Sequence, residues 1–275
     1  MPVAARLARD CRPAFRSGAK AHYDGPMLKQ PKAILFDLDD TLISAYADPG
    51  PVWQALLADH AEALAPHDPG ELTRHVGAYA AEFWSDPARH KTWRLKLYEA
   101  RREIIRGAFE KMNILDQDPR LTAIAHDIAD RYSARRDEAM ALFPESHALL
   151  DHLKGKGIKL ALITNGEGAM QRAKVERFEL THRFDHIQIE GEVGFGKPEE
   201  EAYWHAMDTL ETAPEETWMV GDNYEWEVVA PAALGLTTIW HNSHKAAPPE
   251  GKPAPHHTLD DLSGFWPLLE KTGLA

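Results

Sequence analysis

Five short apolar runs recur along the chain, each about as long as a buried strand. They cover residues 33–37, 159–163, 186–189, 217–220 and 236–240. Helical patterns lie between the later runs, at roughly 145–155, 167–178, 199–210 and 225–234. Strands that are apolar throughout lie buried on both faces of a sheet, and helices connect such strands when they are parallel. The pattern therefore predicts an α/β fold with a doubly wound parallel sheet.

The stretch between the first run and the second is far longer than a crossover connection requires. Its apolar residues recur at helical spacing, as at Leu72 and Val76, with no strand-like alternation. We therefore expect residues 46–141 to form an all-helical domain. This domain is inserted into a core domain made of residues 31–45 and 142–275.

Charge and cysteine content exclude several classes of protein. The formal net charge is −12, whereas a general nucleic-acid binder carries a basic excess. No apolar run is long enough to span a bilayer. The single cysteine, Cys11, cannot form a disulfide within the chain or a cysteine-rich zinc site. We expect a cytoplasmic protein, monomeric or homodimeric, that binds a small molecule, with residues 1–30 as a flexible tail.

Polar side chains follow the predicted strands at the edge of the sheet where ligands bind in doubly wound folds. The first strand ends at Asp37 and Asp39, and the second at Thr164 and Asn165. Lys197 follows a glycine-rich loop after the third strand. The fourth strand is followed by Asp222 and Glu227. Four strands thus bring carboxylates, a hydroxyl and an ammonium group to one edge.

This set of groups suits phosphoryl transfer. Asp37 and Asp222 supply the oxygen ligands that Mg²⁺ prefers, and the metal would keep Asp37 ionised as a nucleophile. Asp39 lies two residues further on, where it can protonate the leaving oxygen and then activate water. Thr164 and Lys197 can contact the phosphoryl oxygens, and we count Asn165 with them as a candidate phosphate-binding residue.

Four segments resemble the motifs of the haloacid dehalogenase (HAD) superfamily, in the same order and with matching spacing. They are residues 36–42 (FDLDDTL), 163–166 (ITNG), 194–198 (GFGKP) and 221–227 (GDNYEWE). The resemblance implies a Rossmann-like core with a helical cap domain inserted after the first strand. It implies Asp37 as nucleophile, Asp39 as general acid and base, and magnesium held by Asp37, the Asp39 carbonyl and Asp222.

The same resemblance bears on the reaction. Members similar to the dehalogenases have no carboxylate at the position of Asp39, because no leaving alcohol needs a proton. Asp39 therefore favours hydrolysis of small phosphate monoesters, of the nucleoside or sugar phosphate class. The motifs are most similar to those of nucleotide and acylneuraminate phosphatases. Glu227 stands where the fourth motif usually has Asp, and it could act through a metal-bound water.

Other interpretations remain open from sequence. Asp37 and Asp39 could cap a helix, and Asn165 could orient the substrate or close a turn. The chain could be a phosphomutase, a dehalogenase-type hydrolase, or an inactive member that binds or regulates. The Lys and Arg residues within 89–111 could form a solvated helix face. Alternatively, one arginine there could reach the site and bind a second anionic group of the substrate.

Overall fold

The computed structural model describes residues 28–45, 49–115, 118 and 120–275. Most of the predicted tail, residues 1–27, lies outside the described residues. The described part contains a six-stranded sheet in the order β5-β4-β1-β6-β7-β8, and every pairing in it is parallel. Its strands are β1 Ala33–Phe36, β4 Lys159–Thr164, β5 His186–Ile189, β6 Thr217–Gly221, β7 Thr237–His241 and β8 His257–Leu259. The predicted α/β fold with a parallel sheet is confirmed.

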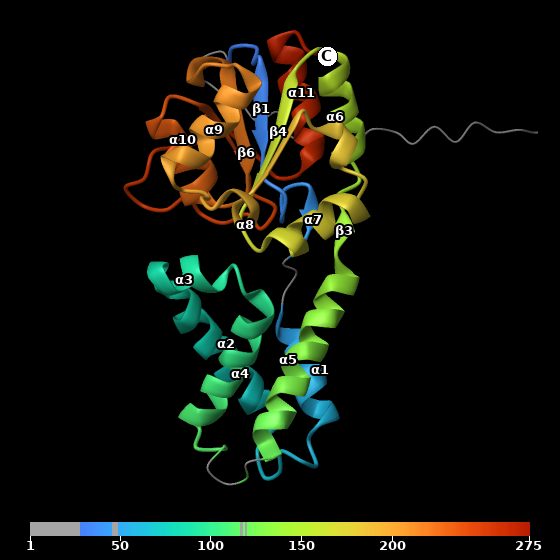
Figure 1. The fold of residues 1–275 in the computed structure, drawn as a ribbon, viewed down its shortest axis with the longest axis vertical. Coiled ribbons are helices and arrows are strands. Elements are labelled where there is room, and N and C mark those ends of the chain that lie inside the picture. The colour runs from blue at the N-terminus through green and yellow to red at the C-terminus, as the bar shows by residue number, and fades with distance from the viewer. Residues whose placement is uncertain (1–27, 46–48, 116–117, 119) are drawn as a thin grey trace, which may run out of the picture.

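Helices cover both faces of this sheet (Figure 1). Successive side chains of a strand point to opposite faces, so β1 contributes Phe36 to one core cluster and Leu35 to another. Helices α6 (Ser146–Gly155) and α11 (Phe265–Thr272) pack on the face of Phe36, and α9 (Glu200–Leu210) packs on the other. The remaining helices of this part are α7 Gly168–Arg177, α8 Glu190–Val193 and α10 Ala230–Ala233, with 3₁₀ turns at Thr181–Arg183, Pro214–Glu216 and Leu262–Gly264.

The single helix expected at 225–234 is replaced by two pieces. A π-helical segment, η3 (Tyr224–Val229), precedes α10. The Asn223 side chain accepts hydrogen bonds from the backbone N–H groups of Glu225 and Trp226, at 3.1 and 3.2 Å. This cap fixes the start of η3, and the wider turn places the Glu227 side chain in the interior.

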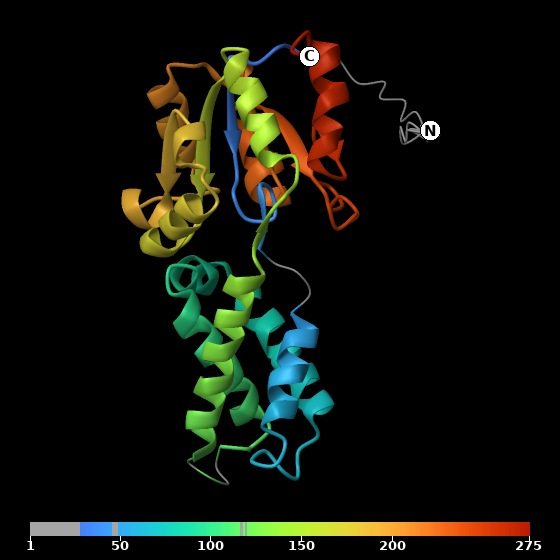
Figure 2. The same ribbon diagram turned by 90° about the vertical axis from the view of Figure 1, so that its right-hand side faces the viewer.

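Five helices form a second body below the sheet (Figures 1 and 2). They are α1 Gly50–Asp59, α2 Pro69–Ser85, α3 Pro87–Trp93, α4 Leu97–Lys111 and α5 Arg120–Ala139. Their apolar faces share a separate core cluster that includes Leu56, Val76, Ile105 and Ile128, each fully buried. Asp68 and Asp86 cap α2 and α3 by accepting backbone hydrogen bonds from Glu71 and Arg89.

Two short strands lie where the chain passes between the sheet and the five helices. β2 (Ile43–Ser44) precedes α1, β3 (Ala141–Leu142) follows α5, and the two pair in antiparallel fashion. The helices therefore begin and end at one neck, which leaves the rest of their upper surface facing the carboxyl edge of the sheet (Figure 2). Among the described residues, no helix is long and apolar enough to cross a membrane.

Candidate active site

The carboxyl ends of β1, β4 and β6 meet at the edge of the sheet that faces the five helices. Asp37 follows β1, Thr164 ends β4, and Asp222 follows β6. The backbone N–H of Asp37 donates to the Val220 carbonyl at 2.9 Å, so it extends the ladder between β1 and β6 by one residue. A pocket of about 520 Å³ lies at this edge. Of the residues predicted from sequence, it is lined by Asp37, Asp39, Thr164, Asn165, Asp222 and Glu227.

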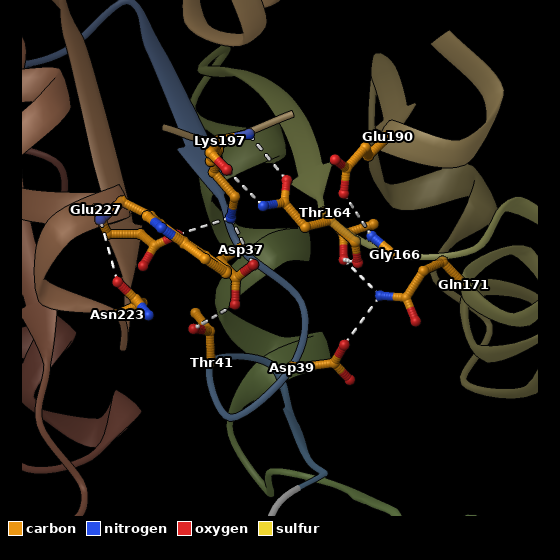
Figure 3. A network of polar contacts seen from close by, with 12 residues as sticks. Asp37, Asp39, Thr41, Thr164, Gly166, Gln171, Glu190, Lys197, Asn223 and Glu227 are labelled. Atoms are coloured by element: carbon orange, nitrogen blue, oxygen red, sulfur yellow. Dashed lines mark hydrogen bonds and ion pairs between the residues drawn. The ribbon is translucent and has the colours of Figure 1, made fainter. Parts of the chain in front are cut away.

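Lys197 is fully buried behind Asp37 and does not line the pocket. Its Nζ lies 2.6 Å from Asp37 Oδ1 and 2.7 Å from Glu227 Oε1 (Figure 3). Burial alone would lower the pKa of Lys197, but the charges of Asp37 and Glu227 outweigh it and raise the pKa above its ordinary value. Lys197 is therefore a permanent cation that two carboxylates share.

Asp37 is held at both carboxylate oxygens. Lys197 binds Oδ1, and the Thr41 hydroxyl donates to Oδ2 at 3.1 Å. Burial raises the pKa of Asp37, and the contact with Lys197 opposes this shift. Gly221 makes the close packing here feasible, because a Cβ at that position would lie 2.2 Å from Glu227 Cγ and 3.0 Å from Asp37 Cβ.

Asp39 contacts two residues that sequence analysis did not single out. Lys174 Nζ lies 2.8 and 3.0 Å from its two carboxylate oxygens. Gln171 Nε2 donates to Asp39 Oδ2 at 2.9 Å and to Thr164 Oγ1 at 2.6 Å (Figure 3). Both partners come from α7, the helix that follows Thr164 and Asn165 in the chain.

Asn165 joins two loops of the site. Its Oδ1 accepts the backbone N–H of Lys197 at 2.9 Å, and its Nδ2 donates to the Lys197 carbonyl at 2.6 Å. The side chain thus fixes the backbone of the loop that delivers Lys197. This differs from the turn closure considered from sequence, and direct contact of Asn165 with phosphate stays a prediction.

Asp222 and Glu227 add negative charge that Lys197 alone does not balance. Burial, followed by the charges of Asp37 and Glu227, raises the pKa of Asp222 to about 9. Burial also raises the pKa of Glu227 to about 7, against the opposing charge of Lys197. No side chain within the described residues donates a hydrogen bond to the Asp222 carboxylate. A cation beside Asp37 and Asp222 would relieve this repulsion.

The oxygen groups of the site suit magnesium, which needs few protein ligands, better than a metal that is bound by protein groups alone. Among the described residues, no three His, Cys, Asp or Glu side chains are grouped so that they could hold a metal ion. Magnesium typically uses one or two carboxylates and completes its shell with water and substrate phosphate. Asp37 and Asp222, with the Asp39 carbonyl, match that requirement.

Comparison with known proteins identifies the family. The family model for haloacid dehalogenase-like hydrolases matches residues 31–235. The chain belongs to the haloacid dehalogenase-like hydrolase family. This confirms the resemblance seen in the four sequence motifs, and the chain is a hydrolase by family.

Curated relatives of this HAD-like hydrolase include two phosphatases. A phosphoserine phosphatase of Thermus thermophilus is 32% identical over 241 residues, which are 76% of this chain and 88% of that protein. An N-acylneuraminate-9-phosphatase of Rattus norvegicus is 31% identical over 140 residues, or 50% of this chain and 56% of that protein. A (S)-2-haloacid dehalogenase of Burkholderia cepacia is 30% identical over 145 residues, or 52% and 62%.

Solved structures share the fold of this HAD-like hydrolase. YfnB, a HAD-hydrolase of Bacillus subtilis whose structure is described as bound to magnesium, has a TM-score of 0.63 at 18% identity. The match covers 88% of this chain and 99% of that one. The likeness therefore extends over both the sheet and the inserted helices.

The helical part of the hydrolase reaches the site through Arg94, just after α3. Its Nε and Nη2 lie 3.1 and 2.6 Å from Glu190 Oε1, and Glu190 Oε2 accepts the backbone N–H of Gly166 at 3.1 Å. The guanidinium also lies over the Trp226 ring, 5.2 Å from its centroid. A second contact, Lys91 Nζ to Glu199 Oε1 at 3.0 Å, joins the same regions. These groups link the helices to the loops of the site.

Three other arginines of 89–111 differ in where they lie. Arg101 lines the pocket together with Arg94. The hypothesis from sequence was that one arginine of this stretch reaches the site. Arg102 and Arg106 instead form ion pairs with Asp130 and Glu103 on the outer surface. Aromatic rings also line the pocket: Trp53 and Tyr132, which stack at 3.8 Å, with Trp84 and Trp226.

Proposed function

We propose that this hydrolase cleaves small phosphate monoesters, of the nucleoside or sugar phosphate class, with magnesium as cofactor and a phospho-aspartyl intermediate on Asp37. The observation that carries the proposal is the pair of carboxylates Asp37 and Asp39 in one pocket, the first held by the buried Lys197. A nucleophile needs a fixed orientation, and a second carboxylate can move protons for it. The phosphatase relatives support this reading.

The first step transfers the phosphoryl group. A carboxylate oxygen of Asp37 attacks phosphorus, the bond from phosphorus to the ester oxygen breaks, and Asp39 gives its proton to the leaving alcohol. The ion pair with Lys197 and the hydrogen bond from Thr41 orient Asp37 for attack. Thr164, at the end of β4, is placed to donate to a phosphoryl oxygen.

The second step regenerates the protein. Asp39, now ionised, takes a proton from water, the water oxygen bonds to phosphorus, and the bond to Asp37 breaks to release phosphate. When bound by Asp37, the Asp39 carbonyl and Asp222, magnesium supplies the positive charge that lets these carboxylates and the substrate lie together. Glu227 pairs with Lys197 at 2.7 Å, so we assign it the role of fixing that lysine.

We further propose that residues 46–141 work as a cap domain over a core domain of residues 31–45 and 142–275. The paired strands β2 and β3 form the neck between them, and Arg94 meets Glu190 on another side of the pocket. Opening at that contact would admit substrate, and closure would exclude bulk water. A small phosphorylated metabolite fits a pocket of about 520 Å³.

A dehalogenase-type reaction is the second candidate, because the relative from Burkholderia cepacia carries that activity in its name. Asp39 counts against it, since loss of halide requires no proton donor. The two reactions differ in product and in metal requirement. Phosphate release depends on magnesium, whereas a dehalogenase releases halide without it.

A panel of phosphate monoesters tests the proposal. Phosphate release is measured with and without magnesium for the wild type, Asp37→Asn, Asp39→Asn and the exposed control Asp260→Asn. We expect release only with magnesium, none from Asp37→Asn, and wild-type rates from the control. Halide release from 2-haloacids would favour the dehalogenase, an isomeric ester with little phosphate a mutase, and no turnover a binding or regulatory protein. Release that survives Asp37→Asn would refute the mechanism.

A further inference from the structure

Two buried polar residues of α7 are not explained by packing. Lys174 and Gln171 are 6% and 2% exposed, and they lie three residues apart, on one face of the helix. Both line the pocket. Lysine is rarely buried unless it is paired, and a buried ion pair is often no more stabilising than apolar residues of similar size. The fold itself therefore gives little reason for these two residues at this place.

Both residues converge on Asp39. Lys174 Nζ spans both carboxylate oxygens, at 2.8 and 3.0 Å, which fixes the plane of the carboxylate. The Gln171 amide group binds Oδ2 at 2.9 Å and Thr164 Oγ1 at 2.6 Å, so one side chain sets the spacing between Asp39 and the hydroxyl at the end of β4 (Figure 3). The carboxylate is thus held by three contacts from a single helix.

We infer that Lys174 and Gln171 are positioning residues that hold the side chain of Asp39 where it can activate water. This inference rests on the proposed phosphatase function. Lys174 donates to both oxygens of Asp39 and Gln171 donates to one, so the carboxyl group has a fixed position and a fixed plane. In the second step Asp39 acts as the base toward water, and that role depends on its orientation. Hydrolysis of the phospho-aspartyl group should therefore depend on these residues more than its formation does.

An aryl ester separates the two steps. With p-nitrophenyl phosphate the leaving phenolate needs no proton, so formation of phospho-Asp37 does not require an acid. Loss of Lys174 should then slow only the attack of water, and the phosphorylated protein should accumulate. In rapid mixing, Lys174→Met is expected to give a burst of about one phenolate per active site, followed by a steady rate lower by on the order of 10²-fold. Lys174→Arg should restore part of the steady rate.

Two further variants make the test decisive. Gln171→Leu removes a hydrogen bond to Asp39 without changing the charge of the protein, so it tests positioning separately from charge. We expect a burst, followed by a steady rate about fivefold lower than that of the wild type. Arg172→Met is the matched control on the same helix, because Arg172 pairs with Glu192 and does not line the pocket. It should behave as the wild type.

The possible outcomes are distinct. Equal losses in burst rate and steady rate would mean a purely structural role and would overturn the inference, as would unchanged kinetics in Lys174→Met and Gln171→Leu. The wild type is measured alongside. A wild type that releases no phosphate would contradict the proposed function, whereas an active wild type with unaffected variants would contradict only the role of Lys174 and Gln171.

Discussion

The ion pair between Arg94 and Glu190 allows a quantitative test of how the helical part docks on the sheet. Their side chains are 11% and 3% exposed, and the guanidinium donates twice to one carboxylate oxygen. In Arg94→Met, the Glu190 carboxylate keeps, among the described residues, only the hydrogen bond from the Gly166 backbone. Leaving one partner of a buried pair without its counter-charge costs about 3–5 kcal/mol. Arg94 is not completely buried, so we expect the lower limit, about 3 kcal/mol.

The double variant carries the decisive comparison. Glu190→Gln should also cost about 3 kcal/mol, because it leaves the Arg94 charge buried. Arg94→Met with Glu190→Gln removes both charges, and we expect it to cost little more than either change alone. Denaturant unfolding measures the three free energies, and each single variant should lower Tm by about 6–12 °C. Single-variant losses that add to within about 0.5 kcal/mol would refute a coupled pair.

An exposed pair provides the control. Arg102 donates to both carboxylate oxygens of Asp130 at 2.6 Å, but the two side chains are 46% and 45% exposed. Solvent screens such a pair, so its coupling in the same cycle should stay at or below about 1 kcal/mol. Coupling as large as that of Arg94 and Glu190 would show that burial is not the cause.

Three further predictions concern the site and its surroundings. Magnesium at a hundredfold excess over its Kd should stabilise the protein by about 2.7 kcal/mol, and thermal unfolding of Asp222→Asn should show little of this shift; an undiminished shift would exclude Asp222 as a ligand. Gly221→Ala places a Cβ 2.2 Å from Glu227 Cγ, so it should lower the free energy of unfolding by about 1–3 kcal/mol and abolish most phosphate release. In the control Gly155→Ala the new Cβ has nothing within 4 Å, and we expect neither effect. Burial, then the charge of Arg94, lowers the pKa of His90, so the unfolded chain binds its proton first as the pH falls. The contribution of His90 to stability is then fully present above about pH 6.5 and is lost as the pH falls below that value. Denaturation at several pH values should show a smaller loss of stability in His90→Gln than in the wild type. An equal loss would assign the effect to other groups.

Much of the core was predictable because its sequence signals are local. Apolar runs of strand length, each closed by a polar residue, give the parallel sheet and place Asp37, Thr164 and Asp222 at one edge. Short elements gave no such signal. β2 and β3 have two residues each, and β8 has three, which is too few for a recognisable period.

Other features depend on contacts that sequence spacing does not encode. Arg94 and Glu190 are far apart in the chain, and only the docking of α3 near α8 brings them together. Lys197 was expected at the pocket, but its position behind Asp37 follows from the loop that Asn165 fixes. Lys174 resembles an ordinary surface lysine in sequence. Its position three residues after Gln171, in the helix that follows Thr164, was the available signal.

The phospho-aspartyl intermediate is the central claim, and acid quenching tests it most directly. The protein is mixed with p-nitrophenyl phosphate and magnesium, quenched in acid within the first turnover, digested and examined by mass spectrometry. Transfer to Asp37 predicts one added phosphoryl group on the peptide that contains this residue, absent without magnesium and absent in Asp37→Asn. Turnover with no phosphorylated peptide under these conditions, or with the label on another residue, would contradict the mechanism.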